Sequence, residues 1–90
     1  MPTVAVEVRG RVQGVGFRMF VQELAGAMGV RGEVWNNRNG AVELVAQHED
    51  PALLSSFIEA LWKGPGRVDS VQPRELAEAP CEGFRVSWTR

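Results

Sequence analysis

The chain lacks several features that would place it in a particular class of protein. Its single cysteine, Cys81, cannot form an intrachain disulfide, and one thiol is too few for a cysteine-based zinc site. Its apolar runs are far shorter than the ~20 residues that cross a bilayer. A net charge of -1 leaves no basic stripe for nonspecific nucleic-acid binding. We therefore expect no disulfide, no membrane association and no nucleic-acid partner.

What remains is the composition of an ordinary globular domain. The 90 residues are 44% hydrophobic and 23% charged. A chain of this size supports one modest core, so we expect a single domain over residues 1–90 and a monomer. The first residues, MPTVAVEV, lack the basic start and apolar centre of a secretion signal. They indicate a cytoplasmic protein.

Two periodicities alternate through the first half of the chain. Valines at every second position from Val4 to Val8 predict a half-buried strand. Apolar residues at helical spacing from Phe20 to Met28 predict a helix, and the glycine that follows suits its C-terminal cap. Residues 32–37 and 41–47 are rich in valine, and the Asn-Gly pair between them tolerates the positive φ of a tight turn. This pair of segments predicts a β-hairpin.

The second half continues the alternation. Asp50 has the position of a helix N-cap before Pro51, and an apolar face follows as far as Leu61. Strands are expected over residues 68–76 and 84–88. The order βαββαβ, with one additional strand, predicts an α+β sandwich in which two helices cover one face of a largely antiparallel sheet.

A glycine-rich turn, GRVQGVGFR from Gly10 to Arg18, joins the first strand to the first helix. A helix N-terminus offers unpaired backbone N–H groups, and glycines allow successive amides to turn toward one anion. Arg18 adds a permanent positive charge that can bind phosphate in a bidentate manner. From spacing alone, a turn with no ligand and a solvated Arg18 is an equal alternative. The nucleotide-binding patterns GxxxxGK[ST] and GxGxxG are both absent.

Two motifs resemble the signatures of the acylphosphatase family. VRGRVQGVGFR, residues 8–18, is similar to the first signature, and GEVWNNRNGAV, residues 32–42, is similar to the second. The resemblance extends over the whole chain and implies a ferredoxin-like fold and hydrolysis of small acyl phosphates to a carboxylate and inorganic phosphate. It implies neither metal nor cofactor. The phosphate-binding residues that it implies are Gln13, Gly14, Val15, Gly16, Phe17 and Arg18, and the water-orienting residue is Asn36.

The second signature departs from the family pattern. Relatives usually carry an aromatic residue at Glu33, often a basic residue at Trp35, and often a glycine at His48. We expect these differences to affect substrate preference and packing around the hairpin. The catalytic asparagine of the family aligns with Asn36, and Asn37 is the register alternative. Strand parity directs the two side chains to opposite faces, so only one can face the phosphate.

The histidine, the serines and the tryptophans are not assigned roles in catalysis or binding. His48 lies beside Glu49 and Asp50, but the three lack the spacing of metal ligands. The serines, Ser87 among them, have no base beside them in the sequence. We expect the tryptophans to be packing residues; they are Trp35, Trp62 and Trp88.

Two other functions fit the same order of elements. One is an RNA-recognition module, which charge balance and the missing aromatic-basic pattern in the central strands disfavour. The other is a phosphate- or carbamoyl-phosphate-binding module, similar to the acylphosphatase-like domain of certain hydrogenase maturation proteins. The short chain, with no zinc-finger cysteines, favours a free-standing enzyme over that module.

Overall fold

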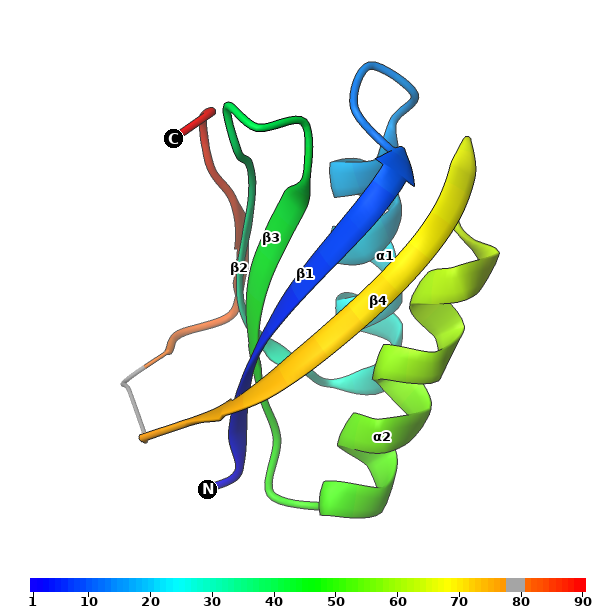
Figure 1. The fold of residues 1–90 in the computed structure, drawn as a ribbon. Helices are drawn as coiled ribbons and strands as arrows, with labels where there is room; N and C mark the ends of the chain where they lie inside the picture. The colour runs from blue at the N-terminus through cyan, green and yellow to red at the C-terminus, as the bar shows by residue number, and fades with distance from the viewer. Residues whose placement is uncertain (78–80) are drawn as a thin grey trace.

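A computed structural model of the chain describes residues 1–77 and 81–90, and it confirms the predicted α+β architecture (Figure 1). The elements, in chain order, are β1 (Thr3–Arg11), α1 (Phe17–Met28), β2 (Arg31–Asn36), β3 (Val42–Gln47), α2 (Pro51–Ala60), the short 3-10 helix η1 (Leu61–Lys63), β4 (Arg67–Leu76) and β5 (Phe84–Val86). The strands form one sheet in the order β4-β1-β3-β2-β5. Among the described strands, β2 and β5 pair in parallel and the other pairs are antiparallel. This is a ferredoxin-like sandwich with an added edge strand.

The core lies between the sheet and the two helices, which cover the same face (Figure 1). Alternate residues of the central strands face it, as period two predicts: Val6 and Val8 on β1 and Leu44 on β3 are at most 2% exposed. The helices contribute their apolar stripes. Their buried residues are Phe17, Val21, Ala25, Leu54 and Phe57. In the part of the chain that the structure describes, no helix covers the opposite face of the sheet (Figure 1).

Both helices lie close to the positions predicted from the sequence, but α1 begins at Phe17, three residues before the predicted Phe20, so Arg18 belongs to its first turn. Gly29 caps α1 in the left-handed conformation, with φ of 70°. At the start of α2, the Asp50 carboxylate accepts a hydrogen bond from the Ala52 N–H at 2.9 Å, and the Asp50 N–H donates to His48 Nδ1 at 2.9 Å. The regular helix ends at Ala60, one residue early, because η1 tightens the chain before Gly64.

Replacing Asp50 by alanine is expected to destabilise the protein by about 1 kcal/mol, because the N–H groups of the first turn of α2 lose their side-chain acceptor. For a domain of this size, that loss lowers the Tm by roughly 4–8 °C. Asp50→Asn retains an acceptor oxygen and serves as the control. Thermal unfolding monitored by circular dichroism compares the three proteins, and equal Tm values would contradict the capping role.

The edges of the sheet explain two details of the sequence. Pro73 is compatible with β4 because β4 is an edge strand, where a missing N–H costs little. At the other edge, β5 ends at Val86, so the predicted alternation does not extend to Trp88. Trp88 is 88% exposed and Trp62 is 47% exposed. The prediction that all three tryptophans are packing residues is therefore wrong for Trp88, which lies beyond the strand and outside the core.

Candidate active site

The glycine-rich turn brings the chain from β1 to the N-terminus of α1. Gly14 and Gly16 both have positive φ, 74° and 83°, a backbone conformation that other residues rarely adopt. Gly16 is the N-cap of α1 and provides no side-chain acceptor for the first-turn N–H groups. The turn therefore presents the positive end of the helix dipole and unpaired donors at its surface.

A small pocket of about 90 Å³ lies at this helix end. Arg18 and Asn36, which are 18 residues apart in the sequence and come from α1 and β2, both line it. From the predicted phosphate-binding turn, Gly14, Gly16 and Phe17 line it as well, whereas Gln13 and Val15 do not. The remaining lining residues are Val12, Met19 and Val86.

The Arg18 guanidinium is held from one side. Its Nη1 donates a hydrogen bond to the backbone carbonyl of Ser87 at 2.8 Å. A guanidinium carries five N–H donors in a planar fork, so one such bond leaves others for an anion. The half-buried Arg18 thus lines the pocket with one fixed contact from its guanidinium.

Asn36 and Asn37 lie at the end of β2 and face opposite sides of the sheet, as strand parity predicts. Asn36 lines the pocket, and its Oδ1 is buried with no hydrogen-bond partner among residues 1–77 and 81–90. Asn37 instead donates from its amide to the Glu43 carboxylate. Of the two adjacent asparagines, the structure therefore places Asn36 beside Arg18. A buried amide oxygen without a partner is uncommon, and here it is available to accept a hydrogen bond from a ligand or water.

Gln13 holds the turn against the β2–β3 hairpin. Its Nε2 donates to the carbonyl oxygens of Asn37 at 2.7 Å and Ala41 at 2.9 Å. These bonds connect the turn after β1 to both ends of the hairpin loop. The side chain of Gln13 thus fixes the position of the turn relative to Asn36, while its backbone N–H remains a predicted phosphate ligand.

Sequence reasoning missed the part of the site that comes from the end of the chain. Val86 lines the pocket and the Ser87 carbonyl binds Arg18, whereas the sequence draws attention to Ser87 only through its hydroxyl. That hydroxyl donates to the Glu33 carboxylate. A backbone carbonyl has no residue-specific signal in a sequence, so only the alternating apolar residues of β5 indicated a strand here.

Glu33 is the acidic group of this region with a shifted pKa. The hydrogen bond from the Ser87 hydroxyl lowers the pKa of Glu33 below its ordinary value of 4.5, and the Arg90 charge lowers it further, against an opposing effect of burial. The folded state therefore binds a proton at this carboxylate less readily than the unfolded chain does. The resulting stabilisation of the folded state is present at pH values above the ordinary pKa of 4.5, and it is lost as the pH falls through the lowered pKa of Glu33.

We expect acid to destabilise the wild type more steeply than Glu33→Gln below pH 4.5, because the amide cannot be protonated in this range. Urea unfolding from neutral pH downward measures the difference. Glu23→Gln, which removes an exposed carboxylate from α1, is the matched control. Parallel pH dependence of the wild type and Glu33→Gln would contradict the assigned coupling.

Two further findings concern metal binding and membrane-spanning helices. Across residues 1–77 and 81–90, no three His, Cys, Asp or Glu side chains gather closely enough to bind a metal ion. His48 accepts the Asp50 N–H at the start of α2, as described above. Within the same ranges, neither helix has the length and hydropathy of a membrane-spanning helix.

Comparison with known proteins agrees with the geometry. The model of the family described as Acylphosphatase matches residues 4–86. An acylphosphatase of Thermus thermophilus is 41% identical over 88 residues, covering 96% of this chain and 99% of the relative. The crystal structure of acylphosphatase from Bacillus subtilis superposes with a TM-score of 0.92 at 34% identity, covering 97% of this chain and 99% of that one.

A second type of relative is much longer. The carbamoyltransferase HypF of Synechocystis is 40% identical over 87 residues, which cover 93% of this chain and 11% of the relative. The two acylphosphatases described above, by contrast, are matched over nearly their full length. Because the family model matches residues 4–86 and the Thermus thermophilus relative is similar over nearly its whole length, the chain belongs to the acylphosphatase family.

Proposed function

We propose that the protein hydrolyses the carboxyl-phosphate bond of small acyl phosphates, with Arg18 binding the phosphoryl group and Asn36 orienting the attacking water. The observation that carries this proposal is the convergence of these two side chains on one pocket at the uncapped N-terminus of α1. A positive helix end, a guanidinium and an unpaired amide oxygen are complementary to an anion and a water molecule.

Phosphate binding uses the donors that the turn leaves unpaired. We expect the phosphoryl oxygens to be bound by the remaining donors of Arg18 and by N–H groups of the turn 13–18, of which Gly14, Gly16 and Phe17 line the pocket. A pocket of about 90 Å³ is far below the size that encloses an organic ligand, so it accepts the phosphoryl group and leaves the acyl group at the surface. We therefore expect tight recognition of the phosphate and loose recognition of the acyl end.

The chemistry requires few groups. A carboxylate leaves readily because its parent acid has a pKa of about 4, so no general acid is needed. Phosphoryl transfer depends chiefly on positioning and charge stabilisation. The Asn36 Oδ1 accepts a hydrogen bond from the water and directs its oxygen at phosphorus. An amide is a poor base, so the water's proton passes to a phosphoryl oxygen of the substrate.

One alternative is a phosphate- or carbamoyl-phosphate-binding module without turnover. It is favoured by the similarity to a part of the carbamoyltransferase HypF. The RNA-binding alternative receives less support, because the helix-free face of the sheet carries Glu7 and Glu43, and its Trp35 ring is covered by Arg90 at 4.0 Å. A monomeric state and a cytoplasmic location stay predictions.

The deciding experiment is hydrolysis of benzoyl phosphate in the presence of a metal chelator. Turnover that continues in chelator supports a metal-free acylphosphatase. If the folded protein binds phosphate but does not turn over benzoyl, acetyl or carbamoyl phosphate, the binding module replaces the enzyme as the proposed function. An electrophoretic shift with single-stranded RNA tests the remaining alternative.

A further inference from the structure

Segment 87–90 continues along β2 beyond the end of β5. The Ser87 N–H donates to the Val34 carbonyl at 2.8 Å, and the Arg90 N–H donates to the Asn36 carbonyl at 2.8 Å. The Arg90 carbonyl in turn accepts the Arg38 N–H at 3.0 Å. The segment therefore follows β2 as far as Asn36, which lines the phosphate pocket.

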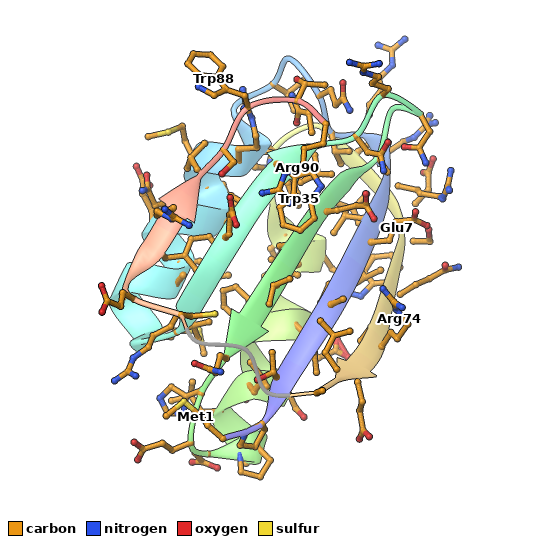
Figure 2. All side chains as sticks on the ribbon, turned by 90° about the vertical axis from the view of Figure 1, so that its left-hand side faces the viewer. Met1, Glu7, Trp35, Arg74, Trp88 and Arg90 are labelled. Carbon is orange, nitrogen blue, oxygen red and sulfur yellow. The ribbon has the colours of Figure 1, made fainter. Side chains whose placement is uncertain are left out.

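Side chains on the helix-free face of the sheet also hold the same segment. The Arg90 guanidinium lies over the Trp35 ring, 4.0 Å from its centroid, and its Nη2 is 2.7 Å from Glu33 Oε2. The Ser87 hydroxyl donates to the same carboxylate. Figure 2 shows Arg90 beside Trp35 at one end of this face. Glu33, Trp35, Ser87 and Arg90 are called the Arg90 cluster below.

Ser87 connects this cluster to the phosphate pocket. Its hydroxyl is bonded to Glu33, while its carbonyl accepts the hydrogen bond from Arg18 Nη1 at 2.8 Å. The carbonyl is the only protein group that the structure records bonded to the Arg18 guanidinium among residues 1–77 and 81–90. Any displacement of segment 87–90 would therefore move the group that orients the arginine.

We propose that Glu33, Trp35 and Arg90 are positioning residues: they hold segment 87–90 so that the Ser87 carbonyl directs the Arg18 guanidinium toward the phosphate. This proposal rests on the proposed role of Arg18. It also assigns a purpose to Glu33 and Trp35, the two hairpin residues that depart from the family pattern. An exposed ion pair alone contributes little, but here the same guanidinium also stacks on an indole and the carboxylate also binds a hydroxyl.

The expected effect is on phosphate affinity. Arginine has many rotamers, and binding is tighter when the charged end is already oriented. We expect Arg90→Ala and Glu33→Gln to raise the phosphate dissociation constant, and the KM for benzoyl phosphate, about tenfold, since small misplacements of a binding group are costly. Arg18 Nη1 should lose its fixed contact, so the guanidinium ¹⁵N resonances of Arg18 should shift or broaden.

Arg85→Ala is the matched control. Arg85 lies 4.0 Å from the same Glu33 carboxylate, but its side chain is 76% exposed and makes no recorded contact with segment 87–90. This variant removes an equal charge and should retain wild-type phosphate affinity and wild-type Arg18 resonances. Inorganic phosphate is titrated into each protein by calorimetry, and the Arg18 resonances are recorded by NMR.

The outcomes separate this proposal from the proposed function. Weaker phosphate binding and altered Arg18 resonances in Arg90→Ala and Glu33→Gln, but not in Arg85→Ala, support positioning. A lower Tm with unchanged phosphate affinity would show that the cluster only stabilises the fold and would overturn the proposal. Equal weakening in Arg85→Ala would overturn it as well, because the effect would then be one of net charge. If Arg18→Ala itself retains phosphate affinity, the proposed role of Arg18 is overturned, and the proposed function fails whatever the variants of the Arg90 cluster show.

Discussion

Replacing Arg18 by alanine is expected to abolish both phosphate binding and turnover of benzoyl phosphate. The loss removes the charged donors that line the pocket at the N-terminus of α1. Removal of a single preorganised donor commonly costs about 3–4 kcal/mol, or roughly a hundred- to a thousandfold in rate, and a whole guanidinium should cost at least that much. Steady-state kinetics and calorimetric titration with phosphate measure the two losses.

Two further variants make the Arg18 result specific. Arg31→Ala removes an exposed arginine from the start of β2, at the end of the strand opposite Asn36, and should behave as wild type. Arg18→Gln retains length and polarity without charge and should be as inactive as Arg18→Ala. Near-normal kinetics in either Arg18 variant would refute the assignment of this residue as the phosphate ligand.

For Asn36→Ala, we expect turnover to be lost while phosphate binding is largely kept. Asn36 contributes the buried, unpaired Oδ1 that is proposed to orient the water, whereas the phosphate donors belong to the turn and to Arg18. The expected fall in kcat is about a hundred- to a thousandfold, the usual cost of removing one preorganised polar group from a reacting centre. The phosphate dissociation constant should change by less than about threefold, within what a peripheral contact contributes.

The adjacent asparagine is the natural control. Asn37→Ala removes the same chemical group one residue later, but that group faces Glu43 on the other side of the sheet. It should leave kcat near the wild-type value. Asn36→Asp tests the position of the amide more closely, since the carboxylate keeps an accepting oxygen but adds a negative charge that repels the phosphoryl group if residue 36 lies at the reacting centre. Normal activity in Asn36→Asp would argue against a water-orienting amide.

Together the two substitutions distinguish the proposed enzyme from a binding module. In an enzyme, Arg18→Ala loses affinity and rate, whereas Asn36→Ala loses rate alone. In a module that only binds phosphate, Arg18→Ala would lose affinity and Asn36→Ala would have no rate to lose. The comparison also tests the division between binding and water orientation, because any large effect of Asn36→Ala on phosphate affinity would merge the two roles.

The sequence alone determined the elements and one half of the site. Alternating valines, helical spacing, the Asp50 cap and the Asn-Gly turn are local signals, and each predicted a segment that the structure confirms to within a few residues. The glycine-rich turn likewise identified a helix N-terminus with Arg18 beside it. Such features depend on neighbours in the chain, so their physical causes are visible in the order of residues.

Tertiary structure decided most of the contacts between distant parts of the chain. The family resemblance had already singled out Asn36 over Asn37, and the pairing of β2 with β3 and β5 shows how that residue reaches the pocket with Arg18. The same pairing extends through segment 87–90 and brings the Ser87 carbonyl to Arg18 and the Arg90 side chain to Trp35 and Glu33. These contacts depend on strand register and on backbone groups that every residue carries. A sequence therefore predicts where a strand lies, whereas the strand pairing in the folded protein determines that the Ser87 carbonyl contacts Arg18.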